Sequence, residues 1–440
     1  MSKYDALIEK KADSAQFMVE EITHICKNLP KRSPGSEGER AASEYMEGVL
    51  REKCGCETTF IETFKENPNA FLGWLYFTLT FSLAGYLLFW FVPVAGAVMV
   101  ALGFAIMIPQ FFFYKKVVDK FFPEKTGTNV TAIKKCKGEV KARIFYNGHQ
   151  DAAWNWPVNE RFGGAVYEAH IALTMLGGLF NLAICIAASV VMQGGVGVAT
   201  PDTYGALFWV GVAGFVFVPI TIALYFMWDE KTIVDGANDN LTACYMGISI
   251  LKAMKDSGFE PENVEVGVIL TGSEEAGLRG SMAWSKAHKD DFNDVPTWII
   301  SFDTIHDKKF LGVNYRDLNG TVKTDKEVGD AFMAAAKELD IACNKTWVPP
   351  LGGATDAAAF AKAGFKATGI TALNHVLEDY YHTRKDTYTN LNAECLADCY
   401  AIAVKVLDNL EKKYAGKAAS DAVEAESAEA AEAAAADQEA

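Results

Sequence analysis

The sequence predicts an α/β fold with a mostly parallel central sheet, interrupted by four transmembrane helices that form two hairpins. Short runs of β-branched or aromatic residues alternate with helical stretches, which favours strands covered by helices on both faces. Four long apolar blocks without Asp, Glu, Lys or Arg break this alternation. The chain has 440 residues, of which 50% are hydrophobic and 22% charged. This composition excludes a disordered chain and allows a sizeable core.

Hydrophobic periodicity predicts the elements of the α/β part in chain order. Helices are expected at 4–28 and 36–53, then near 241–256, 325–339, 354–364 and 393–413. Strands are expected at 58–64, 129–133, 140–147, 264–271 and 298–302. Since helices separate or follow these strands, a three-layer arrangement around the sheet is the expected fold.

The four apolar blocks have the length of membrane-spanning helices. They comprise 71–91, 94–114, 171–192 and 205–228, which is 21 to 24 residues each. A hydrocarbon core about 30 Å thick takes roughly 20 helical residues, and buried helices of soluble proteins rarely run so far without a charge. The blocks therefore predict two transmembrane hairpins in a lipid bilayer. Because the turn of the first hairpin is very short, a re-entrant pair that does not fully span is the alternative there.

The distribution of charge predicts the orientation in the membrane. Neither hairpin turn contains Lys or Arg, whereas the other flanks carry Lys65, Lys115, Lys116, Lys120, Lys125, Arg161 and Lys231. The positive-inside rule then predicts a multi-pass cell-membrane protein whose α/β part and both termini lie in the cytoplasm. The nine cysteines, an odd number without a CxxC pair, are interpreted as reduced thiols. The net charge of −15 argues against nucleic acid as a partner.

Side chains that can ligate metals follow the ends of three predicted strands. His149 and Asp151 follow one strand, Glu274 and Glu275 follow another, and a third ends at Asp303. The carboxyl ends of parallel strands meet at one edge of a sheet, where ligands bind. We therefore expect these side chains to converge.

Two further segments complete a ligand set for two metal ions. Asp239 stands at the start of a helix, and His382 lies in a late loop. With His149, Glu275 and Asp303 they offer two imidazoles and three carboxylates. This mixture suits catalytic Zn²⁺, with Co²⁺ or Mn²⁺ as alternatives.

The neighbours of these ligands suggest supporting roles. Asp151 is placed to hold the second ring nitrogen of His149 and so fix its orientation. Glu274 and Glu275 should diverge, so that one can bind metal while the other acts as general base. Each motif alone has an ordinary explanation as a surface pair, a turn or a helix cap. Their joint placement favours the metal site.

Taken in order, these motifs resemble peptidase family M28, a family of zinc peptidases. The segments that carry the resemblance are Lys31-Arg-Ser-Pro-Gly-Ser36, His149-Gln-Asp151, Gly236-Ala-Asn-Asp239-Asn, Ser273-Glu-Glu275-Ala-Gly-Leu-Arg-Gly-Ser281, Asp303 and Tyr381-His-Thr-Arg-Lys-Asp-Thr387. The similarity covers roughly 20–64 and 125–413. It implies a phosphorylase/hydrolase-like α/β/α fold and a pair of zinc ions.

The resemblance also implies a role for each site residue. Asp239 would bridge the metals, and Glu274 would be the base that activates water. His149 and Asp303 would complete one site, while Glu275 and His382 would complete the other. Asp151 would orient His149, and Asp356 and Tyr381 would lie near the substrate. One departure is Ala357, which stands where the family commonly has a histidine.

The function expected from this reading is that of a membrane-anchored, zinc-dependent exopeptidase, an aminopeptidase acting on peptides. The alternatives are a glutaminyl-cyclase-like zinc transferase and a carboxypeptidase or dipeptidase. A substrate carboxylate could then meet an arginine, although Arg279, Arg316 and Arg384 are each expected to be structural or on the surface.

The expected division of the chain follows from the apolar blocks. The peptidase domain is discontinuous and comprises 1–64, 115–165 and 229–414. The two hairpins comprise 71–114 and 166–228. The remainder, 415–440, is an acidic Ala/Glu-rich tail that is expected to be disordered or loosely helical.

Overall fold

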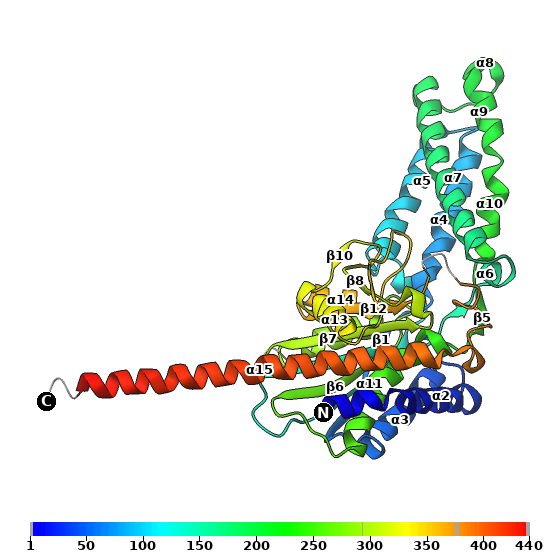
Figure 1. Ribbon diagram of the computed structural model, residues 1–440. Helices are drawn as coiled ribbons and strands as arrows, with labels where there is room; N and C mark the ends of the chain where they lie inside the picture. Colours follow the sequence, from blue (N-terminus) through cyan, green and yellow to red (C-terminus); the bar gives the residue numbers. More distant parts are fainter. Residues whose placement is uncertain (1–2, 293, 375–377, 437–440) are drawn as a thin grey trace.

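An eight-stranded mixed sheet forms the centre of the α/β part, in the order β1-β2-β6-β3-β7-β12-β8-β11 (Figure 1). The computed structural model describes residues 3–292, 294–374 and 378–436. The strands of this sheet are β1 (Thr58–Glu66), β2 (Lys125–Lys134), β3 (Ala142–His149), β6 (Val264–Thr271), β7 (Thr297–Ile305), β8 (Gly312–Asn314), β11 (Asn344–Thr346) and β12 (Lys366–Ala372). Two small sheets pair β4 (Trp154–Asn155) with β5 (Asp229–Ile233) and β9 (Arg316–Asp317) with β10 (Val322–Lys323).

The centre of the large sheet is parallel. Strand β3 pairs in parallel with both β6 and β7, and β7 pairs in parallel with β12. Antiparallel pairs stand toward the edges, between β1 and β2, β2 and β6, and β12 and β8. The mostly parallel sheet predicted from the sequence is therefore confirmed. The strands β8, β11 and β12 and the helix α12 are additions that the sequence did not predict.

Helices cover both faces of the sheet and make the three layers. One face is covered by α1 (Lys3–Glu9), α2 (Lys11–Asn28), α3 (Glu37–Glu52), α11 (Thr242–Asp256), α13 (Lys326–Glu338) and α15 (Ala393–Ala436). The other face is covered by α12 (Arg279–His288) and α14 (Asp356–Ala363). A hydrophobic core lies on each face of the sheet, and successive strand residues point to opposite faces. Tyr146 packs in the core on the first face, and its neighbour Phe145 packs against Trp284 in the core on the second.

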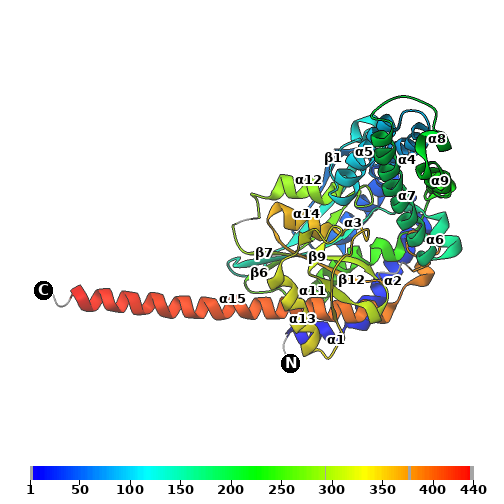
Figure 2. The same cartoon turned by 90° about the horizontal axis from the view of Figure 1, so that it is seen from above.

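The last helix continues from the predicted 393–413 into the tail, which was expected to be disordered or loosely helical. Helix α15 continues beyond 413 to Ala436 and extends away from the α/β part, on the side opposite the bundle of apolar helices (Figure 2). Residues 437–440 of the expected tail lie outside the described residues. The division of the chain into domains stays a prediction.

In the part of the chain that the structure describes, four helices are long and apolar enough to cross a membrane, one at each of the four predicted positions. They are α4 (Ala70–Leu88), α5 (Pro93–Met107) with the turn η1 (Ile108–Phe112), α7 (Gly164–Val191), and a last span made of α9 (Ala206–Gly214), α10 (Phe217–Ala223) and η3 (Leu224–Phe226). They stand together as a bundle on one side of the α/β part (Figure 1). Short helices at its two ends are α6 (Pro157–Phe162) and α8 (Pro201–Tyr204).

The hairpins are inserted where the sheets tolerate them. The first lies between β1 and β2, which pair antiparallel along their full length. The second lies between β4 and β5, which also pair antiparallel. In both cases the ends of the inserted segment start close together, so the bundle can be added without separating the strands that flank it.

Within the bundle, small residues let the helix backbones approach closely. A Cβ atom at Gly85 of α4 would lie 2.3 Å from Val100 Cγ2 of α5, and a Cβ at Gly96 would lie 3.1 Å from the Gly85 carbonyl oxygen. Polar side chains join the helices: Asn181 Nδ2 donates to the Ser82 carbonyl over 2.7 Å, and Tyr86 Oη donates to the Gly177 carbonyl over 2.7 Å. This is the packing expected between helices that lipid surrounds.

Substitution of Gly85 by Leu should destabilise the bundle. The new side chain would overlap Val100, and overpacking typically costs about 1–3 kcal/mol. We expect a lower midpoint of thermal unfolding for the detergent-solubilised protein. The matched control is Leu87→Ala on the same helix, because Leu87 is exposed and its loss should leave the midpoint nearly unchanged. Equal midpoints for the two variants would contradict the close packing of α4 and α5.

Candidate metal centre

Three parallel strands carry predicted ligands to one edge of the sheet. His149 is the last residue of β3, and it stands opposite Thr271, the last residue of β6. Glu274 and Glu275 follow β6 after a two-residue turn. Asp303 lies in β7, which continues to Ile305 rather than ending at Asp303 as predicted. The remaining two ligands come from loops, Asp239 from the short turn η4 (Ala237–Leu241) before α11 and His382 from the segment before η6 (Tyr388–Asn390).

All five predicted ligands lie together, with Asp239 between the two histidines. His149 Nε2 lies 3.2 Å from Asp239 Oδ1, and His382 Nε2 lies 3.0 Å from Asp239 Oδ2. On one side Asp303 Oδ2 lies 4.0 Å from His149 Nε2, and on the other Glu275 Oε1 lies 3.1 Å from His382 Nε2. The arrangement therefore contains two triads that share one carboxylate.

Each triad is compact enough to surround one ion. In His149, Asp239 and Asp303, and again in Asp239, Glu275 and His382, the candidate ligand atoms lie within 4.8 Å of one another. Ligands of tetrahedral zinc at about 2.0–2.2 Å stand roughly 3.3–3.6 Å apart. The separations of 3.0 to 4.0 Å between the ligand atoms given above lie on both sides of this range. A third combination, His149 with Glu274 and Glu275, is also compact, because Glu274 Oε2 lies 3.8 Å from His149 Nε2.

Asp151 links the two predicted motifs on either side of the centre. Its carboxylate accepts from the backbone N–H groups of Glu274 and Glu275, over 3.1 and 3.0 Å. Its Oδ1 also lies 3.4 Å from His149 Nδ1. A carboxylate there favours the proton on Nδ1 and leaves the Nε2 lone pair facing Asp239.

Two positioning residues were not recognised in the sequence. Arg32 is buried and donates to the backbone carbonyls of Gln150, Asp235 and Gly236, over 2.6 to 3.0 Å, so it ties the His149 segment to the Asp239 segment. Asp386 is also buried. It accepts from the backbone N–H of Asp239 over 3.0 Å and from that of Asn238 over 2.8 Å.

The electrostatics of the cluster favour cations. Burial, together with repulsion by neighbouring carboxylates, raises the pKa of Glu274, Glu275 and Asp303 above the usual values. For Asp239 burial opposes the charge, but hydrogen bonds from the two histidines prevail and lower the pKa. Burial would lower the pKa of His382, yet Glu275 and Asp239 raise it to about 10. Two divalent cations would neutralise the crowded carboxylates and replace these protons, so the residues present fit a metal pair.

Comparison with known proteins agrees with this geometry. Residues 226–407 match the model of peptidase family M28. The matched segment is less than half of the chain. It contains Asp239, Glu274, Glu275, Asp303 and His382, whereas His149 precedes it. The resemblance predicted from the motifs is confirmed, and with it the assignment of the chain as a metallopeptidase, a hydrolase. A comparison with curated protein sequences gave no significant match.

Solved structures share the fold at low sequence identity. An aminopeptidase from Aneurinibacillus sp. strain AM-1 superposes with a TM-score of 0.53 at 15% identity, covering 92% of this chain and 95% of that chain. BSAP, a zinc aminopeptidase from Bacillus subtilis, gives 0.53 at 13% identity, with 90% and 95% covered. A glutaminyl cyclase from an Acidobacteriales bacterium gives 0.51 at 12% identity, with 92% and 95% covered. At these identities the likeness shows the fold alone, and the M28 match adds zinc as the expected metal.

An apolar cavity of about 460 Å³ adjoins the candidate metal centre. Glu274, Glu275, Tyr381 and His382 line one end of it. The ring of Tyr381 stacks on that of His382 with centroids 4.0 Å apart, and Trp156 meets the same imidazole edge-on at 4.2 Å. Tyr381 therefore lies in the wall of the cavity, and its role in substrate binding stays a prediction.

Asp356 lies elsewhere. It is buried at the start of α14, where it accepts from Thr271 Oγ1, and it is not among the described residues that line the cavity. The preceding Gly352, Gly353 and Ala354 do line it. Of the three arginines, Arg279 is buried and paired with Asp119, Arg316 donates to the Gly320 carbonyl, and Arg384 pairs with Glu160. None of the three lines the cavity.

Replacing Asp386 by Asn should weaken zinc binding. The amide keeps the shape of the side chain but has only one oxygen. It therefore cannot accept from the backbone N–H groups of both Asn238 and Asp239 as the two carboxylate oxygens do. Loss of such a supporting contact typically costs 10- to 100-fold in metal affinity, and we expect a change of about this size in a zinc titration. Asp379→Asn is the control, because the Asp379 carboxylate is exposed and pairs only with Lys385 among the described contacts. An unchanged zinc affinity for Asp386→Asn would remove the positioning role.

Two buried carboxylates beside the centre predict a pH dependence of stability. Ser273 Oγ contacts Glu39 at 2.7 Å and Glu66 at 2.5 Å. Burial and the charge of Asp151 raise the pKa of Glu39 to about 8, and burial raises that of Glu66 to about 7. Because these folded-state values exceed the usual ones, the folded protein holds the protons more tightly. The associated stability is complete below about pH 4.5 and is lost as the pH rises through 7 to 8.

Glu66→Gln should reduce that loss, since the amide stays neutral and can still accept from Ser273. We expect the unfolding midpoint to fall less between pH 6 and pH 9 than in the unaltered protein, by the equivalent of roughly 2 kcal/mol. Glu124→Gln, at an exposed glutamate paired with Lys65, serves as the control and should follow the unaltered protein. Parallel pH profiles for all three proteins would refute the predicted titration.

Proposed function

We propose that this protein is a membrane-anchored, zinc-dependent aminopeptidase whose catalytic part faces the cytoplasm. The observation that carries the proposal is the pair of triads that share Asp239, beside an apolar cavity that is lined by Glu275 and His382 of one triad. We assign His149, Asp239 and Asp303 to one Zn²⁺ and Asp239, Glu275 and His382 to the other. Co²⁺ or Mn²⁺ would be accepted by the same nitrogen and oxygen ligands.

When bound, the zinc pair would acidify a water molecule and polarise the scissile carbonyl group. Glu274 is the residue of this chain that handles the proton. Its carboxylate lines the cavity but lies 3.8 Å from His149, farther than Asp239 does, which leaves it free to face the attacking water. It takes the proton of that water and passes it to the leaving amine, so one carboxylate acts first as base and then as acid.

The surroundings of Glu274 support this role. Asp151 holds the backbone N–H groups of both Glu274 and Glu275, so the two side chains start from a fixed turn. Burial raises the pKa of Glu274 well above its usual value, and neighbouring carboxylates raise it further, although His149 opposes them. A raised pKa brings a carboxylate closer to the range in which it can both accept and return a proton near neutral pH.

Release of the amino-terminal residue is favoured over release of the carboxy-terminal one. A carboxypeptidase needs a cation for the substrate carboxylate. Arg279 is already engaged by Asp119 and by the Tyr114 carbonyl, and it does not line the cavity. Arg316 and Arg384 do not line it either.

The four apolar helices support anchoring in a bilayer, and the lysines and arginine that flank them at the α/β end support the cytoplasmic orientation. The far turns of the bundle carry no Lys or Arg. A peptide would therefore be hydrolysed at the inner surface of the membrane, close to where the bundle begins.

Glu274→Gln tests the proposal directly. Loss of the base should lower kcat on aminoacyl p-nitroanilides by about 100- to 10,000-fold. The zinc content, measured by mass spectrometry of the purified protein, should stay at two equivalents because the five ligands remain. Asp291→Gln is a control at an acidic residue that pairs with His288 on the surface, and its kcat should be unaltered.

Other outcomes of the same measurements would change the conclusion. Activity that persists in Glu274→Gln would show that another group is the base. One equivalent of zinc, together with cyclisation of amino-terminal glutamine in place of hydrolysis, would indicate the glutaminyl-cyclase-like transferase. The two complete triads favour the hydrolase.

A further inference from the structure

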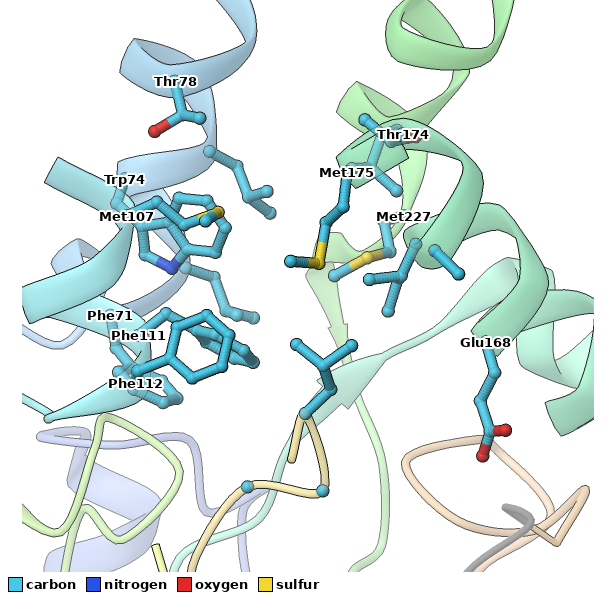
Figure 3. A pocket seen from close by; sticks show the side chains of 18 of the residues that line it. Phe71, Trp74, Thr78, Met107, Phe111, Phe112, Glu168, Thr174, Met175 and Met227 are labelled. Atoms are coloured by element: carbon cyan, nitrogen blue, oxygen red, sulfur yellow. The ribbon is translucent and has the colours of Figure 1, made fainter. Parts of the chain in front are cut away.

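The apolar cavity extends from the metal centre into the bundle of membrane helices. Its lining includes Phe71, Trp74, Thr78 and Ser82 along α4, and Glu168, Thr174, Met175 and Gly178 along α7. From Phe71 to Ser82 the lining follows α4 for about 16 Å, roughly half of a hydrocarbon core about 30 Å thick. Figure 3 shows Trp74 and Met107 on one side of the cavity facing Met175 and Met227 on the other.

The cavity is longer than the side chain of any amino-terminal residue requires. A length of about 16 Å equals roughly five fully extended residues. A volume of about 460 Å³ is also in the range of sites that enclose an entire small ligand. The occupant is therefore either a stretch of extended peptide or a long hydrocarbon chain.

The polarity of the lining distinguishes these two. Five peptide units would bring about ten N–H and C=O groups, each costly to bury without a partner. The Thr78 hydroxyl already donates to the Gly103 carbonyl, and that of Thr174 donates to the His170 carbonyl. The indole N–H of Trp74 is buried without a partner among the described residues, so Trp74 offers a single donor. These groups cannot satisfy a peptide backbone, whereas a hydrocarbon chain needs none.

Charge is confined to the end of the cavity nearest the metal centre. The charged or titratable residues among those that line it are Glu168, Glu274, Glu275 and His382, together with tyrosines. Glu168 belongs to the second turn of α7, at the end of the bundle that joins the α/β part (Figure 3). The cavity thus suits a molecule with a polar head at the metals and an apolar tail between the helices.

We propose that the preferred substrate is an amide whose acyl side carries a single long hydrocarbon chain, lodged between α4, α5 and α7. This inference rests on the proposed function, in which the residue released lies on the acyl side of the bond. The part of the substrate on the amine side of the scissile bond is polar and can have any length. It therefore has to extend into solvent and not into the apolar cavity. Hydrolysis adds water across the amide: the carbonyl carbon gains the hydroxyl oxygen, the C–N bond breaks, and the amine leaves with a proton.

The test uses the full chain in phosphatidylcholine nanodiscs and a series of p-nitroanilides. The acyl groups are 2-aminobutyryl, 2-aminooctanoyl and 2-aminododecanoyl. A fourth compound carries a dodecanoyl group, which has the same chain length as the longest of these but no amino group. Full burial of one methylene group in an apolar site raises affinity about fourfold. We therefore expect kcat/KM to rise by at least about 100-fold from the shortest to the longest aminoacyl group, even though partition of the substrate into lipid offsets part of the gain. Hydrolysis of the dodecanoyl compound as well would support an N-acyl source of the chain, and a strict need for the amine would support an alkyl-bearing amino terminus.

A pair of neighbouring variants locates the chain. Met175→Trp fills the cavity from α7, whereas Leu176→Trp adds the same indole at a position that is 54% exposed on the outer face of that helix. We expect Met175→Trp to lower the ratio of kcat/KM for the longest and shortest substrates by at least about tenfold. Leu176→Trp should keep the ratio within about twofold. If Met175→Trp does not fold, Ala172→Leu is a milder substitution in the same lining.

Binding of the product provides a readout that does not depend on turnover. In calorimetry, 2-aminododecanoate should bind more tightly than 2-aminobutyrate, and Met175→Trp should weaken the former selectively. If the short anilide is hydrolysed but neither kcat/KM nor product affinity rises with chain length, the cavity only holds bilayer lipid and this inference is overturned, while the proposed function stands. If no anilide is hydrolysed, the proposed function fails, and the binding series still decides whether a chain occupies the cavity.

Discussion

The arrangement around Asp239 depends on positive charge that the protein itself does not provide. One buried carboxylate lies between two imidazoles, and three more carboxylates crowd the same space. Burial and mutual repulsion raise the pKa values of Glu274, Glu275 and Asp303. A pair of divalent cations would turn this unfavourable cluster into a stable one, and metal binding would then contribute directly to the stability of the fold.

The α/β fold meets the geometric demand of that cluster in two ways. Parallel pairing of β6, β3 and β7 brings residues far apart in the sequence to one edge. Buried side chains then hold the loops: Asp151 fixes the turn of Glu274 and Glu275, Arg32 joins the His149 and Asp239 segments, and Asp386 holds the backbone of Asp239. The sheet gives approximate convergence, and these contacts determine the distances within the site.

The bundle of apolar helices adds an apolar space next to the candidate metal centre. Both hairpins are inserted between strands that pair antiparallel, so the sheet keeps its order and the bundle rises beside the metal-binding edge. The helices leave an apolar space that is continuous in its lining with Glu274 and His382. The cavity therefore joins the metal-binding residues, where hydrolysis needs water, to an apolar space between the helices.

The sequence by itself determined the fold class, the four apolar spans and the ligand types, because these depend on local patterns. Period and length identify strands and spans, and the residues after a parallel strand must lie at one edge of the sheet. It missed β8, β11, β12 and α12, which are short or lack a clear period. It did not show that Asp386 holds the backbone of Asp239, since a sequence does not show which backbone N–H groups a carboxylate contacts.

Only the tertiary structure decided the distances between ligands, the burial that raises pKa values, and the existence of the cavity. Arg32 acts across more than 100 positions of the chain, and the cavity is made of residues from α4, α5, α7 and the segment before α14. Such features arise when packed elements meet in space. Local periodicity carries no information on how two distant surfaces fit together, so no reading of the sequence could have supplied them.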